Sequence, residues 1–109
     1  MSNLVAVSGT TSIVEGKPVH IGDPYAQTKR CLEVIEESLR PFGLNRSNIL
    51  RTRLFVTDIS QWAEIGRAHG ESFKDHPPAT SMIEVKALID SALLVEIEAD
   101  AVVNLDIDV

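Results

Sequence analysis

LLVEIEADAVV, residues 93–103, alternates apolar and acidic side chains along most of its length. One side of this segment is formed by Val95, Ile97, Ala99, Ala101 and Val103. The opposite side is formed by Glu96, Glu98, Asp100 and Val102. A period of two is typical of a β-strand with one buried face. We therefore expect the longest strand here, with its apolar side under helices and its acidic side facing away from them.

Four segments before it also have the composition of strands, at residues 4–8, 19–21, 49–56 and 79–85. Gly9 ends the first, and Glu15-Gly16-Lys17-Pro18 has the residues of a turn before the second. The third alternates Leu50, Thr52, Leu54 and Val56 with Arg51, Arg53 and Phe55. His76-Pro77-Pro78 breaks the chain before the fourth.

Two amphipathic helices are predicted between these strands. The first begins with Asp23 as N-cap and Pro24 at the first helical position, and Pro41 and Gly43 end it. Its apolar stripe is Cys31, Leu32, Ile35, Leu39 and Phe42. Asp58 or Ser60 caps the second helix, which runs to about Phe73. Its stripe is Trp62, Ile65, His69 and Phe73, with Trp62 as a packing anchor.

The predicted order is β-β-α-β-α-β-β, which gives an α+β domain with two helices on one face of a single mixed sheet. The uncovered face would carry the carboxylates of the last strand. We expect Glu84, Arg51 and Arg53 on that face as well. Such a face is either solvated or part of a hydrated contact between subunits, and the sequence leaves both open.

Composition narrows the class of function. The 109 residues suit one domain, and a net charge of −6 disfavours general binding to nucleic acid. The sequence contains neither a signal-peptide pattern nor a long apolar segment. We therefore expect a cytoplasmic protein without a membrane partner. Cys31 is the single cysteine, and its place on an apolar stripe favours a core residue over a nucleophile. His20, His69 and His76 lack the spacing of metal ligands, so no metal site is expected.

Several motifs, taken in order, resemble one family. Residues 78–85 (PATSMIEV) and 94–99 (LVEIEA) resemble the C-terminal signature of the reactive intermediate deaminase family, the RidA or YjgF group. Residues 7–9 (VSG) resemble its turn of small residues, residues 26–28 (AQT) its first helix, and residues 53–58 (RLFVTD) the strand before its second helix. The resemblance covers nearly the whole chain. It implies a chorismate-mutase-like domain and a homotrimer with small-molecule pockets between its subunits.

The resemblance also implies a reaction and site residues. Family deaminases hydrolyse imines and enamines to keto acids and ammonia, without a metal or an organic cofactor. Glu96 matches the glutamate that holds the attacking water. We expect Ser8, Gly9, Thr80 and Ser81 to contact the ligand. On the residues alone, Glu96 could equally be an outward polar position, Thr80 a strand-favouring residue, and Ser8-Gly9 a simple turn.

Three departures from the family pattern shape the hypotheses. Thr80 stands where the family has an arginine that grips a substrate carboxylate, and Gly66 stands where many members have an asparagine. The family's first N-terminal strand has no counterpart, so we expect one domain over residues 1–109 without it. One hypothesis is a hydrolase for an imine or enamine other than the usual 2-imino acids. The alternative is a trimer that binds a small ligand without catalysis, and RNA cleavage is the weakest hypothesis.

Overall fold

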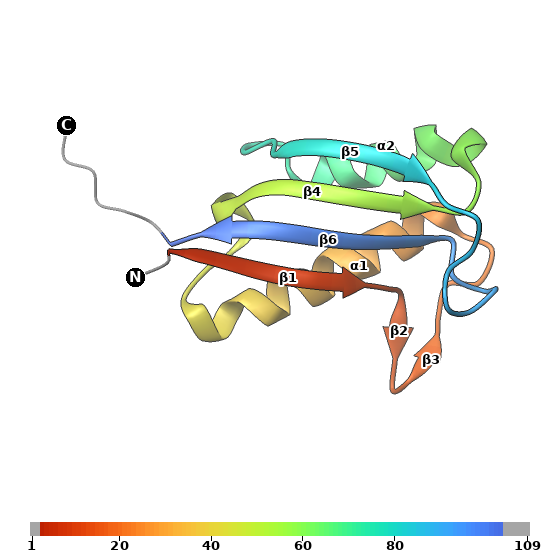
Figure 1. The fold of residues 1–109 in the computed structure, drawn as a ribbon, viewed down its shortest axis with the longest axis horizontal. Coiled ribbons are helices and arrows are strands. Elements are labelled where there is room, and N and C mark those ends of the chain that lie inside the picture. The colour runs from red at the N-terminus through yellow and green to blue at the C-terminus, as the bar shows by residue number, and fades with distance from the viewer. Residues whose placement is uncertain (1–2, 104–109) are drawn as a thin grey trace.

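The computed structural model describes residues 3–103. A four-stranded sheet has the order β1 (Leu4–Thr10), β6 (Val95–Val102), β4 (Ile49–Val56) and β5 (Ala79–Glu84). Strand β6 is antiparallel to both β1 and β4, and β5 is parallel to β4. This arrangement confirms the predicted mixed sheet, and Figure 1 shows it with the helices behind.

Helices α1 (Pro24–Leu39) and α2 (Trp62–Ser72) cover one face of the sheet and leave the other open (Figure 1). The start of α1 follows the predicted cap, whereas the predicted cap of the second helix, Asp58, caps a 3₁₀ helix that precedes α2. The Asp23 carboxylate accepts a hydrogen bond from the backbone N–H of Ala26 at 3.0 Å. Asp58 accepts one from the N–H of Ser60 at 3.0 Å and opens the 3₁₀ helix η3 (Ile59–Gln61), which leads into α2. A local sequence signal therefore determines where α1 begins, whereas α2 continues from η3 without a side-chain cap of its own.

The core lies between the helices and the inner face of the sheet. Most of the predicted inward positions are buried: Cys31, Leu32, Ile35 and Leu39 on α1, Leu54 and Val56 on β4, Ile65 on α2, and Val95, Ile97, Ala99 and Ala101 on β6. The alternating strand pattern and the helical stripes were thus correct for the centre of each element. None of the helices in residues 3–103 is long and apolar enough to cross a membrane.

The second predicted strand is wrong. Residues 19–21 are not a strand, and the chain instead forms a small hairpin of β2 (Ile13–Val14) and β3 (Lys17–Pro18). Glu15 and Gly16 both have positive φ, 50° and 77°. A two-residue turn with positive φ at both positions joins the strands of a tight hairpin. The turn was therefore predicted at nearly the right place, but the strand after it begins two residues earlier.

Two predicted stripe residues are exposed, which corrects the prediction for both helices. Phe42 is 60% exposed, because α1 ends at Leu39 and Phe42 lies in the 3₁₀ turn η1 (Arg40–Phe42), where the helical periodicity no longer applies. Trp62 is 62% exposed at the first residue of α2, so it is not a packing anchor within this chain.

The ends of the strands bring further corrections. Leu50 is 52% exposed, because a β-bulge between Ile49 and Arg51 turns Ile49 inward in its place. Val103 is exposed and lies beyond the end of β6. Strand β5 ends at Glu84, one residue before the predicted end.

Glu84 is not on the open face. It pairs with Val56 of β4, whose side chain is buried under the helices, so the two share the inner side. Its carboxylate accepts a hydrogen bond at 3.0 Å from the backbone N–H of Ile59. The prediction failed because the register between parallel strands is not encoded in the sequence pattern of either strand.

Candidate functional site

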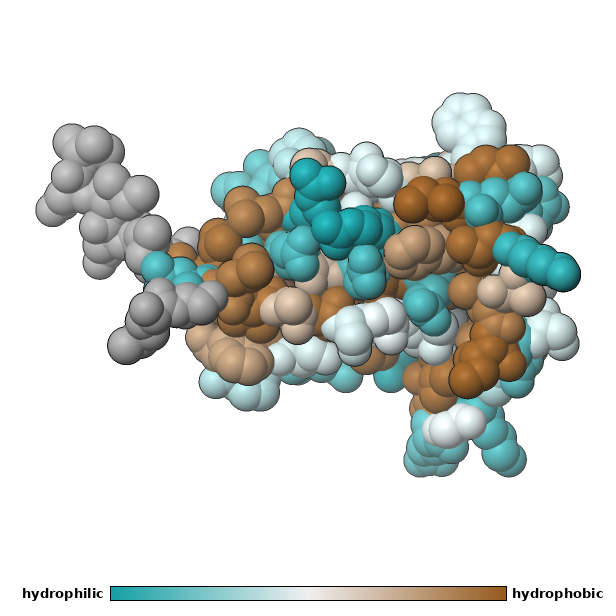
Figure 2. Space-filling model, in the orientation of Figure 1, coloured by the Kyte–Doolittle hydropathy of each residue, from teal (hydrophilic) through white to brown (hydrophobic). Residues whose placement is uncertain are grey.

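The open face of the sheet carries a group of hydrophilic residues flanked by apolar residues (Figure 2). Arg53 on β4 pairs with Glu98 on β6 in the register of the sheet. The Arg53 guanidinium lies 3.2 Å from the Glu98 carboxylate and 3.4 Å from that of Asp100. All three side chains are about one-third exposed, so these ion pairs stabilise the single chain only modestly.

Glu96 differs from the two other acidic residues on this face. It lies opposite Phe55 of β4 in the register of the sheet and is partly buried. Within residues 3–103 its carboxylate has neither a hydrogen bond nor an ion pair. A partly buried carboxylate without a cation keeps its lone pairs available for a water molecule or a ligand.

Gly9 provides the space for the Glu96 side chain. Gly9 lies in the irregular stretch between Val7 and Thr10, where the pairing of β1 with β6 shifts register. A methyl group added at Gly9 would lie 2.8 Å from Glu96 Cδ, which is too close for an undisturbed contact. Ser8, beside it, is exposed, and its carbonyl oxygen accepts a hydrogen bond from the Thr10 hydroxyl at 2.9 Å. The structure thus brings Gly9 against Glu96, with Ser8 next to them.

Thr80 lies on the other side of the sheet. It pairs with Thr52 of β4, and the two hydroxyl oxygens are 2.8 Å apart. Thr52 is buried, and its hydroxyl also lies 2.8 Å from His69 Nε2 on α2. Burial lowers the pKa of His69 to about 4, so the imidazole is neutral at pH 7. Ser81, the next residue, is exposed and lies opposite Arg53 on the open face.

One chain does not bring all the predicted site residues together. Thr80 aligns with Thr52 on β4, whereas Glu96 aligns with Phe55, three residues further along the same strand. The two side chains also project to opposite faces, and β4 separates β5 from β6. A ligand that contacts both Thr80 and Glu96 would therefore have to lie between two chains.

The sequence did not predict that Thr52 and His69 contact Thr80. Thr52 was predicted only as an inward strand position, and His69 only as part of a helical stripe. Their contact with Thr80 depends on the pairing of β4 with β5 and on the packing of α2, neither of which the sequence reveals. A polar residue at a predicted buried strand position was the available signal, because buried hydroxyls nearly always have a hydrogen-bond partner.

The single cysteine and the possible metal ligands add no catalytic group to this site. Cys31 is fully buried, and burial raises the pKa of its thiol to about 12, which makes it a poor nucleophile. This confirms Cys31 as a core residue. The described residues contain no group of three or more His, Cys, Asp or Glu side chains that could hold a metal ion.

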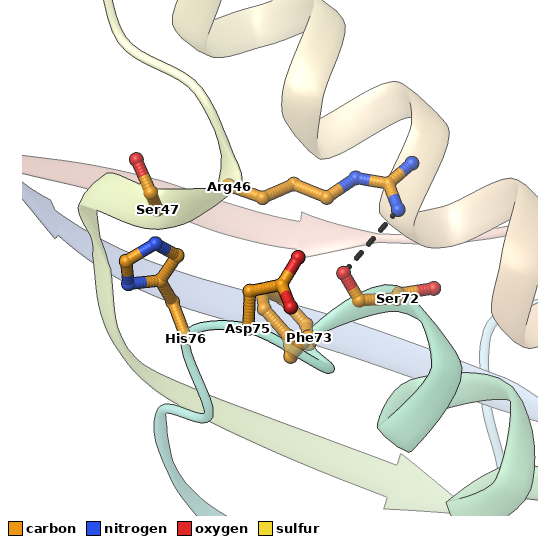
Figure 3. Close-up of a pocket in the computed structure, with 6 residues that line it drawn as sticks. All are labelled: Arg46, Ser47, Ser72, Phe73, Asp75 and His76. Atoms are coloured by element: carbon orange, nitrogen blue, oxygen red, sulfur yellow. Dashed lines mark hydrogen bonds between the residues drawn. The ribbon is translucent and has the colours of Figure 1, made fainter.

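Two surface depressions are present, and neither includes the predicted site residues. One, of about 230 Å³, is lined by Arg46, Ser47, Ser72, Phe73, Asp75 and His76 (Figure 3). Its arginine is already engaged, since Arg46 Nε lies 3.2 Å from the Glu36 carboxylate and Arg46 Nη1 lies 3.5 Å from the Ser72 carbonyl oxygen. The other, of about 260 Å³, lies beside the loop of residues 85–93 and is lined partly by Lys86 and Asp90.

Known proteins resemble the chain over almost its whole length. The family model described as Endoribonuclease L-PSP matches residues 1–103. The crystal structure of Rv2704 from Mycobacterium tuberculosis, a member of the YjgF/YER057c/UK114 family, has a TM-score of 0.83 and 46% identity, and covers 94% of this chain and 81% of that one. Protein SCO2049 of Streptomyces coelicolor is 36% identical over 97 residues, which are 89% of this chain and 72% of that protein.

A relative with a named activity is also similar. The 3-aminoacrylate deaminase RutC of Acinetobacter baylyi is 31% identical over 100 residues, which are 91% of this chain and 79% of RutC. Sequence and fold agree over the same residues, since the whole described sheet and both helices lie within the matched region. The chain therefore belongs to the reactive intermediate deaminase family, the RidA or YjgF group.

Proposed function

We propose that this chain forms a homotrimer with a small-molecule pocket at each subunit interface, and that the pocket hydrolyses a reactive imine or enamine. The observation that carries the proposal is the Glu96 carboxylate, which is partly buried beside Gly9 and lacks a cationic partner in residues 3–103. Support for an interface pocket comes from Thr80 and Glu96, which lie too far apart to meet within one chain.

The chemistry assigned to Glu96 is that of a general base. Its carboxylate accepts a proton from water while the water oxygen bonds to the imine carbon. For a protonated imine this gives a neutral carbinolamine, and Glu96 returns the proton to the carbinolamine nitrogen. The Glu96 carboxylate then accepts the proton of the carbinolamine hydroxyl group while the carbon–nitrogen bond breaks, which releases ammonia and a carbonyl compound, and Glu96 loses its proton to solvent. Exposed backbone at Ser8 and Gly9 supplies hydrogen-bonding groups beside the reacting carbon. This type of reaction fits the family and the deaminase named among its relatives.

The substrate is expected to lack the carboxylate of a 2-imino acid. Thr80 offers a single hydroxyl, whereas an arginine would give a bidentate, charge-assisted pair with a carboxylate. Such bonds are worth roughly 1.5–3 kcal/mol, or about one to two decades in affinity. Hydrolysis of 2-iminobutyrate or 2-aminoacrylate should therefore be negligible.

Thr80 also favours an alternative, in which the trimer binds a small ligand without changing it. RNA cleavage has less support, despite the description of the family model. The chain has a net charge of −6, and Arg53 is already neutralised by Glu98 and Asp100. A cytoplasmic location belongs to the proposal, because Cys31, the single cysteine of the sequence, is a buried thiol.

Release of ammonia from imines formed in situ tests the proposal. We expect the protein to accelerate hydrolysis of a simple aliphatic imine without a carboxylate, and to leave 2-iminobutyrate at its spontaneous rate. Glu96→Gln should abolish the acceleration, whereas the control Glu33→Gln, at an exposed position on α1, should not. Equal activity of Glu96→Gln and the wild type would refute a catalytic Glu96. No acceleration of any imine would leave the binding protein as the better hypothesis.

A further inference from the structure

The Thr80 hydroxyl is the outer end of a hydrogen-bonded chain that begins in the core. Its Oγ1 lies 2.8 Å from Thr52 Oγ1 and 3.2 Å from the carbonyl oxygen of Pro78. Thr52 Oγ1 in turn lies 2.8 Å from His69 Nε2. His69 and Thr52 are buried and Thr80 is exposed, so the chain runs from α2 to the edge strand β5.

The hydrogen-bond donors along His69, Thr52 and Thr80 can be assigned for both neutral tautomers of His69. If Nε2 carries the proton, His69 donates to Thr52, Thr52 donates to Thr80, and Thr80 donates to the Pro78 carbonyl. If Nε2 is the acceptor, Thr52 donates to His69 and Thr80 donates to Thr52. In both cases the Thr80 hydrogen has an acceptor inside the protein, and at least one Oγ1 lone pair is unused.

We infer that Thr80 selects ligands that donate N–H groups, such as amines, amidines and protonated imines, over ligands that present a carboxylate. A ligand N–H can bond to the unused lone pair without breaking any bond in the protein. A carboxylate can accept a hydrogen bond from Thr80 only by replacing Pro78 or Thr52 as the acceptor. Otherwise the carboxylate oxygen faces the lone pairs of Thr80 Oγ1, which repel it. The inference rests on the proposed function, which places Thr80 of one subunit at the ligand.

Charge in the proposed pocket acts in the same direction. Glu96 has no cationic partner in the described part of the chain, so a neighbouring subunit would contribute an unneutralised carboxylate. Opposite charges attract more strongly in a partly desolvated pocket than in water. The Thr80 lone pair and the Glu96 carboxylate therefore both favour a cationic ligand that donates N–H groups.

Propionamidine and propionate form a matched pair of probes, because they have the same shape and differ in whether their planar fork donates or accepts hydrogen bonds. Both are titrated into ¹⁵N-labelled full-length protein at pH 7, and amide shifts at positions 80–82 and 96 report binding. We expect the wild type to bind propionamidine at least about tenfold more tightly than propionate.

Substitutions at Thr80 separate its effect from that of Glu96. Thr80→Val keeps the shape and removes the lone pair, and should lower the affinity for propionamidine about five- to tenfold while leaving that for propionate within about twofold. Thr80→Ser should retain the wild-type preference, and Thr80→Arg should reverse it. Thr57→Val, a matched change at the end of β4, should leave the preference unchanged.

Light scattering on the same samples distinguishes a failure of the proposed trimer from a failure of the inference about Thr80. A monomer would contradict the proposed trimer and this inference together. A trimer that binds propionate as tightly as propionamidine, that binds neither probe, or whose preference is unchanged in Thr80→Val would overturn this inference and leave the trimer intact.

Discussion

His69 is a buried base whose protonation is tied to folding. Its Nε2 lies 2.8 Å from the Thr52 hydroxyl, and burial lowers its pKa to about 4. An unfolded histidine has a pKa of about 6.5. Between these two values His69 binds a proton in the unfolded chain but not in the folded chain, so its contribution to the free energy of unfolding rises with pH across this window and is constant above it.

The prediction is a loss of stability on acidification that depends on this residue. Between pH 7 and pH 4 the wild type should lose up to roughly 3 kcal/mol more unfolding free energy than His69→Gln. Urea unfolding at pH 7, 5.5 and 4, at one protein concentration, measures the difference. His76→Gln, at an exposed histidine, should follow the wild type. If His69→Gln shows the same pH dependence as the wild type, His69 is not the residue responsible.

Gly9 gives a second test at the scale of one residue. Gly9→Ala would place a methyl group against the Glu96 carboxyl group. The end of the Glu96 side chain is flexible, so we expect it to move and the fold to survive with a loss of less than about 1.5 kcal/mol. Displacement of the proposed base should lower Glu96-dependent hydrolysis by about 100-fold. Gly70→Ala, where an added Cβ contacts nothing within 4 Å, is the matched control. Full activity of Gly9→Ala would show that the position of Glu96 is not critical.

Helix α2 contains Gly66 and Gly70, both exposed and both with open space around an added Cβ. Glycine within a helix costs roughly 0.5–1 kcal/mol relative to alanine, because the unfolded backbone has more freedom to lose. Gly66→Ala should therefore raise the free energy of unfolding by about that amount, as measured by urea unfolding. A destabilised Gly66→Ala protein would mean that position 66 packs against something beyond the single chain.

The elements differ in how far the sequence predicted them. The start of α1 follows from Asp23 and Pro24, and the inner face of β6 from strict alternation, because each signal acts within a few residues. Phe42 and Leu50 were misplaced because a 3₁₀ turn and a β-bulge changed the periodicity. Glu84 was misplaced because strand register is a property of two segments.

The candidate site divides in the same way. The roles of Glu96 and Gly9 in a site stay predictions from their motifs, and the structure places the two residues side by side. The partners of Thr80 were not predicted, because Thr52 and His69 reach it only through the pairing of β4 with β5 and the packing of α2. The sequence identified the residue types, and the tertiary arrangement decided which of them meet.

For the whole molecule, the open face of the sheet is the main feature that one chain leaves unsatisfied. Leu4 and Val102 pair on this face towards one end, and Phe55 and Ile83 pair towards the other. The ion pairs of Arg53 lie between them. Apolar residues on both sides of a compact charged group are expected of a surface that is covered by other subunits and partly hydrated at its centre.

The final prediction is that the protein is a trimer in solution through this face. Light scattering at micromolar concentration should give three times the 11.9 kDa mass of one chain. Ile83→Lys places a charge on the open face at a residue that is already 43% exposed, so it should change the stability of the single chain little. It should strongly destabilise the assembly, because a buried, unpaired ammonium group is unfavourable. We expect a lower mass with unchanged secondary structure. Phe42→Lys, an equally drastic change on η1 outside the sheet, should leave the trimer intact. A wild-type mass of one chain would refute the trimer, and an unchanged mass for Ile83→Lys would place the subunit contact elsewhere.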